Sequence, residues 1–171
     1  MSRTPPRLQP RLQVLRLDHA PALLDFEREN RAYFAASVPD RGDEYFAHFG
    51  ERHRALMAEQ DAGLCHFHVL VEDGGEVVGR VNLVDVAEGS AELGYRIAEK
   101  AAGRGLATAA VREACGLAVT EYGLTSLRAV TTLDNPGSRA VLARTGFVPT
   151  GGLQLDGRPG LRFLCDLRTP A

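Results

Sequence analysis

The chain has little that would mark a secreted, membrane-spanning or nucleic-acid-binding protein. Its 171 residues include three cysteines, Cys65, Cys115 and Cys165. An odd number without a C-x-x-C pair argues against a disulfide framework or a zinc site and favours free thiols. His66 and His68 would share one face of a strand, but no third ligand is placed beside them, so no metal is expected. The net charge of −2 provides no basic field for nucleic acid.

Long apolar runs are also missing. The opening "MSRTPPRLQP" is polar and proline-rich, without the apolar core of a signal peptide, and no segment approaches the ~18 apolar residues of a membrane span. We therefore expect a cytoplasmic protein that binds no membrane. Residues 1–10 are interpreted as a flexible N-terminal arm, and the length predicts a single domain over residues 11–171.

Hydrophobic periodicity predicts alternating strands and helices. Strands are expected at residues 11–17, 65–72, 77–86, 91–98 and 127–133, followed by a hairpin around Asp156–Gly160. Four helices are expected. The first follows Asp18, which would cap it, and the second runs from Asp43 to about Ala58. The third begins after Gly105, and a short fourth helix ends at Gly146. This order predicts an α+β fold of three layers, in which helices cover both faces of a mixed sheet.

The stretch "AAGRGLATAAVREA" (residues 101–114) places Gly103, Arg104 and Gly105 immediately before the third helix. Glycines let backbone N–H groups approach an oxygen closely, and a helix N-terminus carries partial positive charge. A phosphate cradle and a plain connecting loop both remain open on these residues alone. A dinucleotide fingerprint is disfavoured, because its sixth position is Thr108 where glycine or alanine is needed.

A second motif follows at a suitable distance, in "TTLDNPGSRAVLARTGF". The pair of motifs resembles the GNAT acetyltransferases, whose acetyl-CoA loop Q/R-x-x-G-x-A/G precedes N-x-x-S and G-F. Here the motifs correspond to Ala102–Ala107, Asn135–Ser138 and Gly146-Phe147. The segments "ELGYRI" and "FERENRAYF" resemble the RimJ/RimL type, which acetylates N-terminal α-amines of ribosomal proteins.

The resemblance implies acetyl-CoA as cosubstrate and a mostly antiparallel, splayed sheet between whose strands pantetheine inserts. Since Ala102 replaces the usual Gln or Arg, the phosphates would depend more on Arg104 and on backbone N–H groups. The cofactor-binding residues implied are Tyr95, Arg96, Ile97, Gly103, Arg104, Gly105, Leu106, Ala107, Thr108, Asn135 and Ser138.

Direct attack of the amine in a ternary complex requires a base and an acid. Glu92 is the candidate base by resemblance, and a surface glutamate is the alternative. Ser138 is the candidate acid, with Tyr95 and Tyr122 in reserve, although a serine after a Pro-Gly turn is also a good helix cap. A glutamate with a pKa near 4.3 is a weak base, which suits an α-amine better than a lysine.

The acceptor is the least determined part of the interpretation. Asn30 and Tyr33 are the candidate substrate residues, in a region where acidic side chains such as Glu27 could attract a cationic amine. An ordinary amphipathic helix pair is the alternative. The activity expected is acetylation of a protein N-terminus, with a small amine such as a polyamine or antibiotic, or a non-catalytic CoA-binding module, as alternatives. A homodimer through a sheet edge or helix is compatible with all three.

Overall fold

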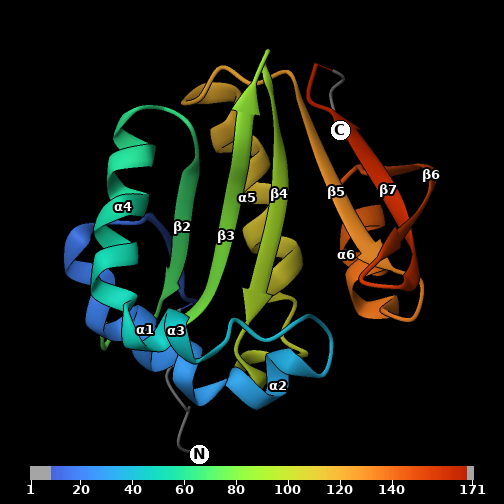
Figure 1. Ribbon diagram of the computed structural model, residues 1–171. Helices are drawn as coiled ribbons and strands as arrows, with labels where there is room; N and C mark the ends of the chain where they lie inside the picture. Colours follow the sequence, from blue (N-terminus) through green and yellow to red (C-terminus); the bar gives the residue numbers. More distant parts are fainter. Residues whose placement is uncertain (1–8, 169–171) are drawn as a thin grey trace, which may run out of the picture.

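The computed structural model describes residues 9–168 and contains an open seven-stranded sheet with helices against it (Figure 1). Most of the predicted N-terminal arm, residues 1–10, therefore lies outside the described residues. The strands are β1 (Arg11–Val14), β2 (His66–Val71), β3 (Val77–Ala87), β4 (Ser90–Ile97), β5 (Ser126–Thr132), β6 (Val148–Leu155) and β7 (Arg158–Asp166). The helices are α1 (Ala20–Glu29), α2 (Arg31–Ala35), α3 (Asp43–Ala47), α4 (Phe49–Asp61), α5 (Leu106–Thr120) and α6 (Pro136–Arg144), with 3-10 turns at Leu17–His19 and Glu99–Ala101.

The strand order is β1-β2-β3-β4-β5-β7-β6. All neighbours are antiparallel except β4 and β5, which run parallel because α5 connects them. The mixed, mostly antiparallel sheet predicted from the sequence is thus confirmed.

Helices cover both faces of the central strands, as Figure 1 shows for α4 and α5 on opposite sides of β2 and β3. Residues Val77–Val81 of β3 are all buried, which requires cover on both faces. Arg80 reaches Glu27 of α1 on one face. Its neighbour Val81 points to the opposite face, against which α5 packs. The core therefore consists of two layers of apolar side chains, separated by the sheet.

The sheet divides between β4 and β5. Their parallel pairing begins at Ser90↔Ser126 and stops at Glu92↔Arg128. Beyond that point β4 continues along β3 as far as Ile97, and β5 continues along β7 as far as Thr132↔Gly160. The gap between β4 and β5 widens along their length in Figure 1. One backbone edge of residues 93–97 thus has no strand beside it.

Several predicted boundaries differ from the observed ones. The first strand ends at Val14 and not at residue 17. Asp18 caps no helix, because it lies inside the first 3-10 turn and pairs with the Arg16 side chain. The helix expected from Asp43 to about Ala58 is two helices, α3 and α4, that meet at His48. Periodicity continues across His48, so only its non-helical backbone reveals the break.

The His66 and His68 side chains are both engaged with Tyr122. The His68 ring is 1% exposed, and its nitrogens lie 3.1 Å from the Val81 carbonyl oxygen and 2.6 Å from the Tyr122 hydroxyl. The His66 ring stacks on Tyr122 at 3.6 Å between centroids. Burial lowers the pKa of His68, so this ring is neutral and structural.

Leu83 provides a test of the core on the α5 side of the sheet. It is fully buried on β3 opposite Leu93. We expect Leu83→Ala to lower the free energy of unfolding by about 2–5 kcal/mol, because the cavity refills only in part. Leu133→Ala, at a position that is 42% exposed, should change it by less than about 0.5 kcal/mol. Chemical denaturation of both variants measures this, and equal midpoints would contradict the assignment.

Candidate active site

A cavity of about 970 Å³ occupies the gap between β4 and β5. The two walls are residues 93–97 of β4 and residues 129–132 of β5. The start of α6 and the glycine loop close one side, and α2 with the loop after it closes the other. The cavity therefore lies where the sheet leaves backbone groups unpaired.

The glycine loop has the backbone geometry of an anion cradle. Gly103 and Gly105 adopt φ angles of +75° and +73°, in the left-handed region that glycine tolerates without a steric penalty. Gly105 is also the residue that caps α5, whose first N–H groups therefore point out of the loop. A Cβ at either glycine would meet nothing within 4 Å, so the loop borders open space.

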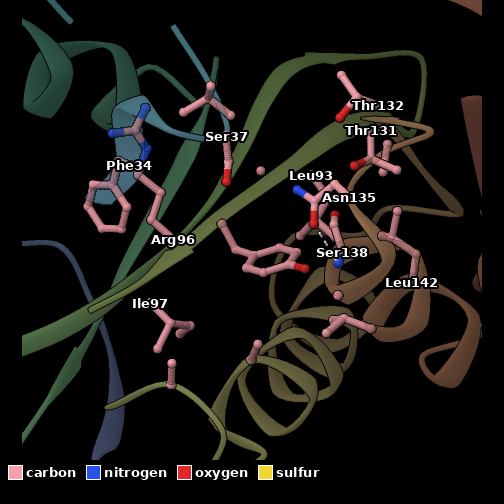
Figure 2. A pocket seen from close by; sticks show the side chains of 18 of the residues that line it. Phe34, Ser37, Leu93, Arg96, Ile97, Thr131, Thr132, Asn135, Ser138 and Leu142 are labelled. Atoms are coloured by element: carbon pink, nitrogen blue, oxygen red, sulfur yellow. Dashed lines mark hydrogen bonds between the residues drawn. The ribbon is translucent and has the colours of Figure 1, made fainter. Parts of the chain in front are cut away.

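Asn135, Ser138 and Tyr95 meet at the α6 side of the cavity. The Asn135 side chain accepts a hydrogen bond of 3.1 Å from the Ser138 backbone N–H, and it is Asn135 that caps α6 (Figure 2). The alternative in which Ser138 caps the helix is therefore wrong, and its hydroxyl is free for another role. This hydroxyl lies near the Tyr95 phenol and acts to lower its pKa. Burial raises the pKa of Tyr95, an effect that Ser138 opposes, so the phenol stays protonated at neutral pH.

The opposite side of the cavity is built from arginines and aromatic rings. Figure 2 shows Arg96 beside Phe34 and Ser37, across the cavity from Asn135 and Ser138. The Arg96 guanidinium carbon lies 4.9 Å above the Phe34 ring. In this cation–π geometry the ring stabilises the charged guanidinium. Burial and the neighbouring Arg41 lower the pKa of Arg96, so positive charge is crowded at this point.

Most of the predicted site residues come together in this cavity. Those that line it are Tyr33, Tyr95, Arg96, Ile97, Gly103, Gly105, Leu106, Ala107, Thr108, Asn135 and Ser138. Glu92, Arg104 and Asn30 are not among the lining residues. Asp156 and Arg158, of the hairpin between β6 and β7, also line it. Tyr122, a reserve acid, binds His68 and does not reach the cavity.

The three predicted residues outside the lining have other contacts. Arg104 lies 3.6 Å from the Glu72 carboxylate at the end of β2. Asn30 is buried and accepts a hydrogen bond of 3.0 Å from the Glu99 N–H, which ties α1 to the turn before the glycine loop. Glu92 is half-buried on β4, in register with Val84 and Arg128.

Among the lining residues that sequence reasoning missed, Arg41 and Asn82 bear on the chemistry of the site. Arg41 lies in the loop between α2 and α3, and no periodicity predicts that this loop folds back onto β4. Asn82 lies on β3 two residues after Arg80, and within residues 9–168 its buried side-chain oxygen has no hydrogen-bond partner. Two polar residues spaced two apart in a buried strand, Arg80 and Asn82, were the available signal.

The part of the chain that the structure describes comprises residues 9–168. In this range no helix is both long and apolar enough to cross a membrane. The same residues contain no cluster of three or more His, Cys, Asp or Glu side chains suited to a metal ion.

Comparison with known proteins agrees with this geometry. The family model of the acetyltransferase (GNAT) domain matches residues 11–148. "Probable N-acetyltransferase YjcK" of Bacillus subtilis (strain 168) is 28% identical over 147 residues, covering 82% of this chain and 81% of YjcK.

Solved structures share the fold. RimJ of Mycobacterium smegmatis, in complex with CoA-disulfide, has a TM-score of 0.80 and 27% identity, covering 91% of this chain and 80% of RimJ. A spermidine N-acetyltransferase from Vibrio cholerae, in complex with CoA and spermine, has a TM-score of 0.76 and 19% identity, covering 94% and 96% of the two chains. Because the family model spans the split sheet, the glycine loop and α6, the chain belongs to the GNAT family and is an acetyl-CoA-dependent N-acetyltransferase of the RimJ/RimL-like type.

Proposed function

We propose that the protein transfers the acetyl group of acetyl-CoA to the N-terminal α-amine of a protein. The observation that carries this proposal is the cavity in the split sheet, which has a phosphate cradle at one end and two hydroxyl groups on its α6 wall. The structural likeness to RimL, a ribosomal L7/L12 alpha-N-protein acetyltransferase, supports the choice of acceptor.

The donor side fits the parts of coenzyme A. The unpaired edge of residues 95–97 offers backbone groups to the amides of pantetheine, as an added strand would require. The glycine loop and the start of α5, residues 103–108, offer N–H groups to the pyrophosphate. Since Arg104 faces Glu72, the backbone carries more of this role than the sequence suggested.

The reaction forms a C–N bond and breaks the C–S bond of the thioester. A backbone N–H of the β4 edge stabilises the oxyanion that develops on the acetyl carbonyl. The thiolate that leaves takes a proton from the Ser138 hydroxyl, and the neighbouring Tyr95 hydroxyl resupplies it. The amine loses its proton to water, and Glu92, outside the cavity lining, accepts it through that water.

The acceptor side is consistent with an α-amine. A free α-amine has a pKa of about 7.7–8.0 and is partly neutral at pH 7, whereas a lysine near 10.4 is not. A base that acts only through water therefore suffices. Tyr33, which is 41% exposed at the mouth of the cavity, is the proposed acceptor contact, and Asn30 positions the turn before the glycine loop.

Acceptor identity is tested by thiol release from acetyl-CoA with N-terminal peptides, polyamines and aminoglycosides. We expect turnover on peptides, abolished when the α-amine is blocked by formylation. Turnover on spermidine alone would contradict the N-terminal assignment, and silence with all amines while CoA binds would favour a binding module.

The hydroxyl pair is tested with Ser138→Ala and Tyr95→Phe. Each should lower kcat by about tenfold with little change in KM for acetyl-CoA, because a thiol of pKa near 8.5 leaves tolerably without an acid. Thr120→Val, at an exposed position on α5, is the control and should be silent. Unchanged kcat in both variants would show that neither hydroxyl protonates the thiolate.

The role of Glu92 is tested by the pH profile of Glu92→Gln. Loss of the proton acceptor should lower kcat by about tenfold at pH 7. The deficit should shrink as the pH rises above the amine pKa of about 8, since the amine is then neutral without help. A profile parallel to that of the wild type would show that Glu92 is not the base.

A further inference from the structure

A buried group of charges lies beneath the α2 side of the cavity. The Glu27 carboxylate is 1% exposed and contacts three guanidinium groups: Arg80 at 2.9 Å, Arg41 at 3.2 Å and Arg96 at 3.3 Å. One carboxylate thus faces three cations, and the group carries two positive charges in excess. Two of its members, Arg41 and Arg96, line the cavity.

The Glu27 carboxylate is ionised and paired with these three arginines. Burial alone would raise the pKa of Glu27, but the charges of Arg80, Arg41 and Arg96 together lower it, so the carboxylate stays ionised. Its lone pairs are directed at buried guanidinium groups, and a charge held in this way is costly to separate from its partners. The expectation that Glu27 attracts a cationic amine is therefore not met by its contacts.

The guanidinium groups of Arg41 and Arg96 have N–H donors that Glu27 does not use. Arg41 uses Nε for Glu27, and Arg96 uses Nη1. Within residues 9–168 no hydrogen bond satisfies the two terminal nitrogens of Arg41, or Nε and Nη2 of Arg96. Aromatic rings hold both groups flat, with Arg41 at 4.7 Å over Tyr45 and Arg96 at 4.9 Å over Phe34. A planar fork held in place is suited to a carboxylate.

Acidic side chains nearby do not cancel this field inside the cavity. Asp40 and Asp43 both bind Arg31, each at 2.8 Å, and neither lines the cavity. Of the charged residues that do line it, four are arginines and Asp156 alone is acidic. A polycation such as a polyamine would meet repulsion here.

The same face of the sheet holds an acceptor for an N–H group. Asn82 Oδ1 is buried and has no hydrogen-bond partner within residues 9–168. Asn82 lies two residues from Arg80 on β3, so the two side chains share a face. Its neighbour on β4 is Gly94, where an added Cβ would meet nothing within 4 Å. The surface between Asn82 and Arg96 is therefore open.

Donor binding does not account for these groups. Adjacent residues of a strand point to opposite faces, so Arg96 and Tyr95 lie on different sides of β4. Tyr95 faces Ser138 of α6, whereas Arg96 faces Phe34 and Ser37 (Figure 2). The arginines thus lie on the face opposite to the hydroxyl pair.

We propose that the acceptor is a primary amine that also carries a carboxylate, with Arg41 and Arg96 binding the carboxylate and Asn82 Oδ1 accepting a hydrogen bond from the amine. This inference rests on the proposed acetyl transfer and narrows its substrate. A protein N-terminus with an acidic residue at the second position has this chemistry, and a free acidic amino acid has it too.

The test compares C-terminally amidated peptides Ala-Asp-Ala, Ala-Asn-Ala and Ala-Lys-Ala with free glutamate and spermidine. Binding is measured by calorimetry on the full chain with CoA present, and thiol release is measured separately with acetyl-CoA. We expect Ala-Asp-Ala to bind at least about tenfold more tightly than Ala-Asn-Ala, which is the scale of a charged hydrogen bond. Equal binding of these two peptides, or tighter binding of Ala-Lys-Ala or spermidine, would overturn the proposal.

Variants assign the preference to the arginines. Arg41→Gln should reduce the Asp-to-Asn discrimination to less than about threefold and leave the affinity for CoA unchanged, because Arg80 and Arg96 still hold Glu27. Arg54→Gln, on the exposed surface of α4, is the control and should keep the full discrimination. Discrimination that survives Arg41→Gln, or a large loss of CoA affinity in that variant, would overturn the assignment.

The two measurements separate this inference from the proposed function. Preferential binding of the acidic ligands without thiol release would support anion recognition and contradict acetyl transfer to them. Thiol release of equal efficiency on Asp, Asn and Lys peptides would support acetyl transfer and overturn the acidic preference. A comparison of Ala-Asp-Ala-amide with free glutamate identifies the acceptor class. If the peptide is the better substrate, the acceptor is a peptide N-terminus, and if glutamate is the better substrate, the acceptor is an amino acid.

Discussion

The end of hydrogen bonding between β4 and β5 is the constraint on which the site depends. Up to Glu92↔Arg128 the two strands share a ladder, and beyond it each follows its other neighbour, β3 or β7. Unpaired backbone groups are costly when they are buried and dry. Here they border a cavity of about 970 Å³, so a ligand that pairs with them gains hydrogen bonds that the fold itself leaves unmade.

The α6 side and the α2 side of this cavity are chemically different. On the α6 side, Tyr95 and Ser138 offer neutral hydroxyl groups, and Asn135 takes over the capping of the helix. On the α2 side, Arg41 and Arg96 present cations supported by one buried carboxylate, Glu27. Because alternate residues of β4 face opposite sides, one short strand contributes side chains to both sides, and the reacting carbonyl would lie between a proton donor and an anion site.

Glu27 shows how a buried charge can serve a site that it does not touch. Its carboxylate neutralises part of the charge of three guanidinium groups, which could not be packed together without it. Aromatic rings then fix the planes of Arg41 and Arg96. The two guanidinium groups are therefore held in place before a ligand binds. Such preorganisation reduces the conformational entropy lost on association.

Local sequence determined the order of most strands and helices and the motif residues, because hydrophobic periodicity, glycine conformation and capping act over a few positions. The resemblance to the GNAT motifs linked Gly103, Gly105, Asn135 and Ser138, and in the structure all four line one cavity. Only the tertiary structure decided the partners of the charged residues. The sequence cannot show that Glu27 meets Arg80, 53 positions away, because such pairing depends on how α1 crosses the sheet. The excess of positive charge on the α2 side of the cavity therefore depends on how α1 crosses the sheet.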